Sequence, residues 1–220
     1  MNFKWAANLL RIRFFMYLLL ITTFSNSVFA QNSASRGETA KNELTVWAGG
    51  SFLTGSLVGK TDQVRLGQIG FRYARRFNNS DKVNLKYFVD VVPVTILSYP
   101  ETRVVQLSAN NFQIEEYRRN IYAAGAAPLG LQINFRPRKK YQPFINGSGG
   151  LLYFNQKTPA VGGTRFNFTA DAGGGLEIKL KKQTAVLVGY KYHHISNGSR
   201  GFVNPGFDSN VFYVGYSFFK

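Results

Sequence analysis

The feature that most constrains this chain is an alternation of apolar and polar residues with a period of two, sustained over long stretches. It is clearest over residues 165–180. Successive side chains point to opposite faces only in an extended strand, so the pattern predicts β-structure rather than amphipathic helix. One face carries Phe166, Phe168, Ala170, Ala172, Leu176, Ile178 and Leu180, and the other carries Arg165, Asn167, Thr169, Asp171, Glu177 and Lys179.

The same alternation marks further strands on both sides of this stretch. It recurs between Val83 and Val91, and within 118–136 it assigns Ile121 and Leu131 to the apolar face. A tilted strand needs about 9–11 residues to cross a bilayer, and several of the segments are longer. The predicted strands are 43–54, 62–77, 83–97, 118–136, 140–154, 164–180, 183–194 and 209–219.

The connections between these segments alternate in length. Short turns on one end and long loops on the other are typical of outer-membrane barrels, in which the short turns are periplasmic. The short connections are 78–81, 137–139 and 181–182, and the long ones are 98–117, 155–163 and 195–208.

Two barrel types fit this pattern, and they differ in which face points inward. A soluble barrel of the lipocalin type would bury the apolar face. The opposite face of one strand carries Arg165, Asp171, Glu177 and Lys179, which are too many polar groups for a small dry core. We therefore predict an all-β fold, an eight-stranded antiparallel transmembrane β-barrel with its apolar face toward lipid and both termini in the periplasm.

The N-terminus has the three parts of a secretory signal peptide. Lys4, Arg11 and Arg13 precede an apolar run at 14–24, and small-residue cleavage fits after Ala30. The apolar run is shorter than the roughly 20 residues of a spanning helix, which argues against an uncleaved anchor. The predicted organisation is a signal peptide at 1–30, a flexible segment at 31–42 and a barrel at 43–220.

Composition narrows the partners and the chemistry. Removing the predicted signal peptide takes away three positive charges, so the mature net charge is 16 − 3 = +13. Such a charge suggests an anionic partner, and for an exported protein we expect phosphorylated lipid headgroups rather than nucleic acid. With no cysteine, thiol nucleophiles and Cys-ligated zinc are excluded. No cofactor is expected.

The C-terminal end carries the candidate site. His194 and Ser196 are two residues apart, so on a strand both point to the exterior face, and Asp208 has the parity of the exterior residues on the next strand. A hydroxyl, an imidazole and a carboxylate are the set required for acyl transfer to serine. Ordinary rim residues among polar headgroups are the alternative. His193 has the opposite parity and is expected inside, so the two histidines point apart and a shared metal is not expected.

The segments His194-Ile-Ser-Asn-Gly198 and Asn204-Pro-Gly206 resemble the PagL-like lipid A deacylases, the acyloxyacyl hydrolase family of outer-membrane enzymes. The resemblance implies hydrolysis of an ester-linked acyl chain of lipid A in the outer leaflet. It makes Ser196 the nucleophile, His194 the general base and Asp208 the orienting acid. It also implies oxyanion or substrate contacts from Asn197, Gly198, Ser199 and Asn204, and we add Arg200 as the basic residue nearest to the site.

Two residues depart from the family pattern. The acid is Asp208 where glutamate is usual, and Ser199 stands where glycine is expected. Two other functions remain open from the sequence: a non-enzymatic barrel for adhesion or membrane structure, and a lipid A acyltransferase. The oligomeric state is also open, with a homodimer among the possibilities. The expected location is the outer membrane.

Overall fold

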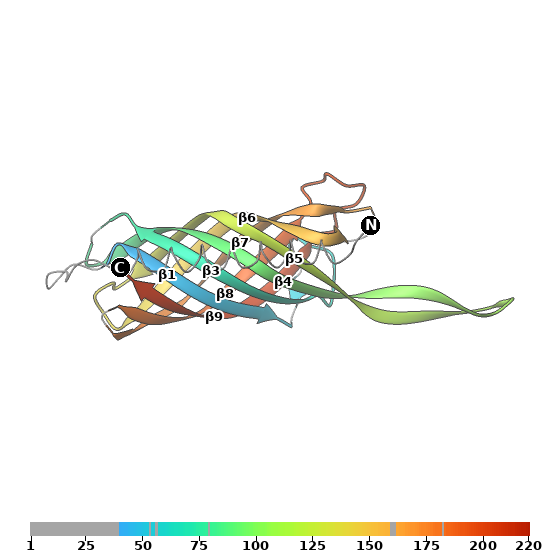
Figure 1. The fold of residues 1–220 in the computed structure, drawn as a ribbon, viewed down its shortest axis with the longest axis horizontal. Helices are drawn as coiled ribbons and strands as arrows, with labels where there is room; N and C mark the ends of the chain where they lie inside the picture. The colour runs from blue at the N-terminus through green and yellow to red at the C-terminus, as the bar shows by residue number, and fades with distance from the viewer. Residues whose placement is uncertain (1–39, 53, 56, 79, 159–161, 182) are drawn as a thin grey trace, which may run out of the picture. The chain divides into compact units, whose positions relative to one another are not determined.

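The period-two segments form antiparallel strands that close into a ring (Figure 1). This computed structural model describes residues 40–52, 54–55, 57–78, 80–158, 162–181 and 183–220. The predicted signal peptide and nearly all of segment 31–42 therefore lie outside the described residues. The strands are β1 (Asn42–Ser51), β2 (Thr54–Gly55), β3 (Arg65–Arg76), β4 (Val83–Ser108), β5 (Asn111–Phe135), β6 (Tyr141–Thr158), β7 (Thr164–Lys181), β8 (Thr184–Ser196) and β9 (Phe207–Phe219).

Each long strand pairs with its neighbours in chain order, and β1 pairs with both β3 and β9, which closes the barrel. The two-residue β2 continues beside β9 beyond the end of β1. All described pairings between named strands are antiparallel, so the predicted eight-stranded antiparallel barrel is confirmed. Among the described residues, no helix is long and apolar enough to cross a membrane.

The barrel turns its apolar face outward. On β9, Phe212 and Val214 are 62% and 56% exposed, whereas Tyr213 between them is buried. On β4, Asn84, Lys86 and Asp90 are buried, as their parity predicted. The lipocalin-type alternative is therefore wrong, because it requires the reverse arrangement.

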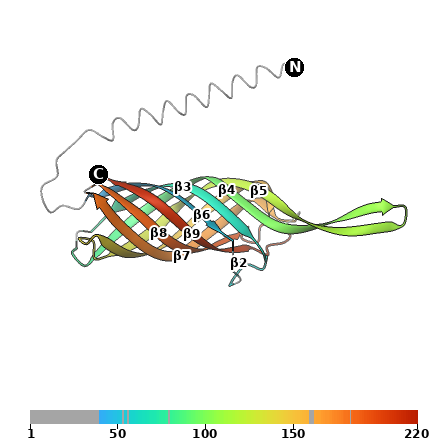
Figure 2. The ribbon, with the colours of Figure 1, turned by 90° about the horizontal axis from the view of Figure 1, so that it is seen from below.

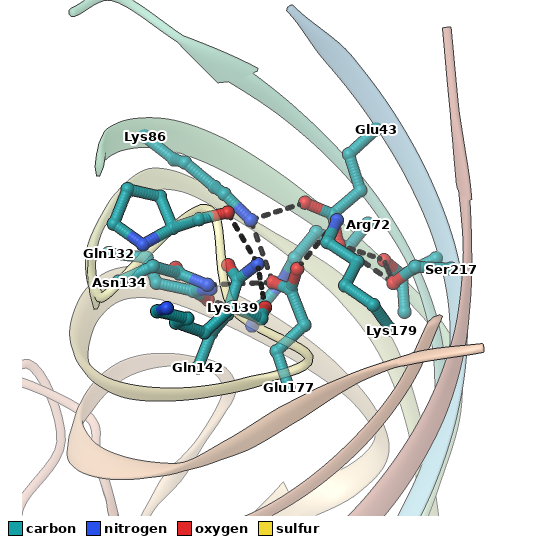
Figure 3. A network of polar contacts seen from close by, with 12 residues as sticks. Glu43, Arg72, Lys86, Gln132, Asn134, Lys139, Gln142, Glu177, Lys179 and Ser217 are labelled. Carbon is teal, nitrogen blue, oxygen red and sulfur yellow. Dashed lines mark hydrogen bonds and ion pairs between the residues drawn. The ribbon is translucent and has the colours of Figure 1, made fainter. Parts of the chain in front are cut away.

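Hydrogen-bonded charges fill the interior at the short-turn end (Figure 3). Lys86 Nζ lies 2.7 Å from a carboxylate oxygen of Glu43 and 2.8 Å from one of Glu177, and Lys179 lies 2.9 Å from the other oxygen of Glu177. Deeper inside, Arg72 forms a bidentate pair with Asp90 at 2.8 Å. Buried charges are tolerated when paired in this way, so this end is a satisfied polar core.

An apolar cluster fills the interior at the opposite, long-loop end. Its members come from six of the strands and from the segment before β3, and all are buried. The interior of the barrel is thus packed with side chains at both ends. The cluster comprises Val64, Leu66, Leu97, Tyr99, Ile121, Ala123, Leu152, Phe154, Ile195, Phe207 and Val211.

The placement of Ile121 on the exterior face was wrong. Ile121 is fully buried and belongs to the interior cluster, whereas Leu131 is 60% exposed as predicted. A register shift between Ala126 and Leu129 separates the two residues. Pro128 lies within the shift, and a proline has no N–H to donate to the ladder. The inserted residue reverses the parity of the strand on its other side.

The connection 98–117 has the predicted length but not the predicted loop conformation. β4 and β5 remain paired through it, with Val104 opposite Ile114 and a turn at Ala109 and Asn110. The two strands continue past the barrel as a twisted ribbon (Figures 1 and 2). The β-branched residues Val104, Val105 and Ile114 favour strand, and the Arg103–Glu115 pair at 2.8 Å links the two halves of the ribbon.

Candidate active site

The structure brings His194 and Asp208 together on the exterior of the barrel near its long-loop end. The two residues lie directly opposite each other on β8 and β9, and His194 Nδ1 is 2.6 Å from Asp208 Oδ1. His193 and Ile195 on either side are 2% and 1% exposed and face inward, whereas the His194 side chain is 18% exposed. The predicted outward orientation of His194 is therefore confirmed.

Asp208 is held by three other groups besides His194. Its Oδ2 atom accepts hydrogen bonds from the backbone N–H groups of Val58 and Gly59, both at 2.7 Å, and from the Tyr192 hydroxyl. The side chain is fully buried although it lies on the outward face. Hydrogen bonds to an ionised carboxylate are strong and favour its charged form, so these donors stabilise an anion beside the imidazole.

Ser196 is the last residue of β8 and shares the outward face of His194. Its neighbours Ile195 and Asn197 are both buried, and its partner across the sheet is Phe168 on β7. Residues two apart on a strand are separated by about 7 Å along the chain. Among the described residues no hydrogen bond joins Ser196 to His194. Two of the three predicted catalytic residues, Asp208 and His194, are therefore in contact, and Ser196 lies beside them on the same face.

The connection between β8 and β9 is tied together by two asparagines. The N–H of Asn197 donates to Asn204 Oδ1 at 3.0 Å, and Asn197 Nδ2 donates to the carbonyl of Val203 at 2.8 Å. Asn197 is fully buried. Its role in the structure is to hold the loop, whereas Asn204 is exposed and its Nδ2 group donates to no described residue.

A tight turn follows Ser196. Gly198 and Ser199 have φ values of 60° and 59°, and the N–H of Arg200 donates to the carbonyl of Asn197 at 3.3 Å. Glycine adopts this left-handed conformation freely, whereas serine adopts it at a cost of about 1 kcal/mol. The structure therefore explains why glycine is favoured at position 199. No described group accepts a hydrogen bond from the N–H of Gly198 or Ser199.

Arg200 lies against the aromatic wall beside Ser196. Its guanidinium carbon is 4.8 Å from the ring centroid of Phe168 and 5.8 Å from that of Phe166. Phe168 is also the cross-strand partner of Ser196, so the cation lies next to the predicted nucleophile. Stacking of this kind holds a guanidinium at a lipid-facing surface with its charge available to a ligand.

His193 points into the barrel, as predicted from its parity. Its Nδ1 atom contacts Asp171 Oδ1, and Lys191 Nζ lies 3.4 Å from the other oxygen of Asp171. Ser148 donates to that same oxygen at 2.8 Å. His193 thus belongs to an interior polar cluster, separate from His194. In the described part of the chain, no group of three or more acidic, histidine or cysteine side chains is arranged to hold a metal.

Two parts of this site were not predicted from the sequence. Tyr192 has the same outward parity as His194, and this was the available signal for its contact with Asp208. The amides of Val58 and Gly59 are backbone groups contributed by a loop about 150 residues away in sequence, for which no side-chain pattern exists. Neither contribution follows from the His-x-Ser spacing.

Comparison with known proteins agrees with the fold. A solved structure described as the outer membrane enzyme PagL matches with a TM-score of 0.54 and 16% identity, covering 79% of this chain and 97% of that one. OprG from Pseudomonas aeruginosa matches at 0.45 and 12% identity, over 84% of this chain and 98% of its own. Neisserial surface protein A matches at 0.43 and 13%, over 81% and 96%. The similarity to the PagL structure shows a shared barrel fold.

No curated protein matches the chain. The family model described as lipid A 3-O-deacylase (PagL) matches residues 81–217. This match covers more than half of the chain and includes His194, Ser196 and Asp208. The chain therefore belongs to the lipid A 3-O-deacylase (PagL) family.

Proposed function

We propose that this protein is an outer-membrane esterase that hydrolyses an ester-linked acyl chain of lipid A, with Ser196, His194 and Asp208 as its catalytic residues. The observation that carries the proposal is the 2.6 Å contact between His194 and a buried Asp208 on the apolar exterior of the barrel. Membership of a deacylase family supports it. A lipid-facing wall is an unfavourable place for such a pair unless the substrate is itself a lipid.

The reaction begins with attack of Ser196 Oγ on the ester carbonyl carbon. His194 Nε2 accepts the hydroxyl proton, while Asp208 Oδ1 accepts a hydrogen bond from Nδ1–H and thereby selects the required tautomer. The tetrahedral intermediate collapses with cleavage of the bond to the sugar oxygen, and His194 returns the proton to that leaving alcohol. Water then attacks the acyl-serine with His194 again as base, which releases the fatty acid and restores Ser196.

The negative charge on the tetrahedral intermediate requires donors close to Ser196. The Nδ2 group of Asn204 and the backbone N–H groups of Gly198 and Ser199 are the candidates, because none of them is used by another described group. Asn197 contributes indirectly, since its own N–H is bonded to Asn204 Oδ1 at 3.0 Å and so orients that side chain. Removing one such donor from an esterase costs about 100- to 1000-fold in kcat.

The wall below the site has room for an acyl chain. Ala170 on β7 lies opposite His194, and on the other side of β7 it lies opposite Gly149 of β6. Further along the same face, Ala172 lies opposite Gly147. A side chain placed at Gly149 would meet no atom within 4 Å. A strip of small residues thus runs along the outward face from the catalytic residues toward the middle of the bilayer.

Arg200 is proposed to contact a phosphate of the lipid A headgroup, in keeping with the predicted mature charge of +13. We further propose that export requires the segment 1–30, with cleavage after Ala30. N-terminal sequencing of protein extracted from outer membranes should then begin at Gln31, and a chain retaining Lys4 would show that the segment is an anchor.

The test is mass spectrometry of lipid A from cells that produce the protein, compared with cells that produce equal amounts of folded Ser196→Ala protein. The proposal predicts loss of one ester-linked acyl chain in the first case and intact lipid A in the second. Unchanged lipid A with the wild-type protein would favour a passive barrel. An added acyl chain would favour an acyltransferase.

A further inference from the structure

We propose that the loop segment 57–60, together with Tyr192, positions the catalytic acid by fixing the rotation of the Asp208 carboxylate. The proposal rests on the proposed function, in which Asp208 orients His194. It adds a part that the family match does not contain, because the segment lies before residue 81, where that match begins.

The two oxygens of the Asp208 carboxylate have different hydrogen-bond partners. Among the described residues, the only hydrogen-bond partner of Oδ1 is His194, whose Nδ1 lies at 2.6 Å. Oδ2 takes the N–H groups of Val58 and Gly59 at 2.7 Å each, as well as the Tyr192 hydroxyl. Rotation of the carboxylate would break the bonds of Oδ2, so these donors keep Oδ1 directed at the imidazole. Aspartate has one methylene fewer than glutamate, and it still reaches Nδ1 because Asp208 lies directly opposite His194.

The segment is itself fastened next to Asp208. The N–H of Lys60 donates to the carbonyl of Pro205 at 2.7 Å, and Thr61 forms a parallel bridge with Phe207. On the other side, Gly55 of β2 is paired in register with Asp208. Backbone contacts therefore fix the loop to β9 both before and after the two amides, and the donors do not depend on a flexible side chain.

The close approach requires glycine at position 59. A Cβ atom there would lie 2.9 Å from Asp208 Oδ1, and 3.0 Å from both its Cγ and its backbone nitrogen. The 2.9 Å distance is shorter than real Cβ contacts and the two distances of 3.0 Å are tighter than nearly all of them, so alanine would push the loop away from Asp208. The φ value of Gly59 is not in the left-handed region, so the effect of alanine is steric and acts directly on the Asp208 contact.

The first experiment removes one donor and leaves the packing in place. Tyr192→Phe deletes the hydroxyl that contacts Asp208. Tyr190→Phe is the matched control, since Tyr190 is the next outward residue of the same strand and its hydroxyl donates to Asn210 at 2.7 Å instead. We expect Tyr192→Phe to lower kcat about tenfold, a typical cost of losing a hydrogen bond that positions a catalytic residue. KM should stay within about twofold of the wild-type value. Tyr190→Phe should leave both constants unchanged. Equal effects of the two variants on kcat would overturn the proposal.

The second experiment displaces the loop. Gly59→Ala should lower kcat by about tenfold to a hundredfold, the range for lost positioning contacts. Gly67→Ala is its control, because a Cβ at Gly67 meets nothing within 4 Å. Folding of each variant is checked by the mobility shift of the unheated barrel on electrophoresis. If Gly59→Ala does not fold, the Tyr192 pair alone decides the outcome.

A third measurement does not depend on lipid A. The proton on His194 Nδ1, hydrogen-bonded to Asp208, should give a far-downfield proton resonance in lipid nanodiscs. Tyr192→Phe should move this resonance and Tyr190→Phe should not; no movement in Tyr192→Phe would overturn the proposal. A resonance that responds as expected in a protein that leaves lipid A intact would instead reject the proposed function and retain the positioning contact.

Discussion

Two carboxylates of this barrel, Glu177 and Asp208, are equally buried but are held by opposite kinds of partner. Glu177, inside the barrel, is bonded to the cations Lys86 at 2.8 Å and Lys179 at 2.9 Å. Asp208, on the outer wall, is bonded to two backbone amides, a tyrosine hydroxyl and a histidine. Its described partners therefore include no permanent cation.

The difference separates a structural carboxylate from one that is suited to catalysis. A lysine beside a carboxylate neutralises its charge, which stabilises the buried pair and leaves little field for a third group. Neutral donors keep the carboxylate ionised without cancelling its charge. Asp208 is thus able to stabilise the positive charge that arises on His194 when the imidazole accepts a proton.

The largest effect is expected from the catalytic residues. Ser196→Ala and His194→Ala should each reduce kcat for lipid A deacylation by several orders of magnitude, because the members of a catalytic triad act as a unit. The barrel should remain folded, since Ser196 and His194 lie on its outward face. Activity is measured as fatty acid release in detergent micelles with matched amounts of folded protein.

His193→Ala is the matched control for His194→Ala. It should leave kcat nearly unchanged, because His193 faces the interior. It should lower stability by about 1–3 kcal/mol, since it breaks the contact with Asp171 in the interior cluster. If His193→Ala abolishes activity and His194→Ala does not, the assignment of the site to the outer wall is wrong.

The interior network should respond in the opposite way. Lys86→Met removes the shared cation between Glu43 and Glu177 and leaves two buried carboxylates short of a partner. We expect the free energy of unfolding to fall by about 3–5 kcal/mol, with kcat per folded molecule unchanged. Urea titration in lipid vesicles measures the first quantity. A large fall in kcat in fully folded Lys86→Met protein would show that the interior network around Glu177 also contributes to catalysis.

The strip of small residues should matter for substrate rather than for folding. Gly149→Phe places a ring on the open outward face next to Ala170. The ring should obstruct an acyl chain that lies on this wall and lower kcat/KM about tenfold, with a smaller effect on a short-chain water-soluble ester. An equal effect on both esters would indicate a disturbed barrel rather than an obstructed chain.

The smallest effect concerns the headgroup. Arg200→Ala should raise KM for phosphorylated lipid A several-fold, as expected for one charge-assisted contact of an exposed side chain, and should leave cleavage of a neutral ester unchanged. The comparison is made with the two substrates in the same micelles. Equal loss on both would assign Arg200 to packing against Phe168 rather than to a phosphate contact.

Much of this protein was predictable because side-chain parity on a strand is a local property. Alternation and the lengths of the connections predicted the barrel, and the polar residues on one strand face predicted its apolar exterior. Alternation also predicted the inward face of His193 and the outward face of His194. The same reasoning was wrong at Ile121, where a register shift beyond Ala126 reverses the parity. The same reasoning assigned 98–117 to a loop, because strands were expected to end once they had crossed the bilayer. Nothing in that expectation predicts two strands that stay paired beyond the barrel.

The sequence by itself determined which residues face outward near the C-terminus, and it identified a histidine, a serine and an acid among them. Only the tertiary structure decided how that acid is held. The register of β8 and β9 places Asp208 opposite His194. The loop at 57–60 then brings two backbone amides to the carboxylate from about 150 residues away in sequence. The physical reason is that backbone donors are the same at every position except proline, so their meeting with Asp208 is set by chain closure and not by residue type.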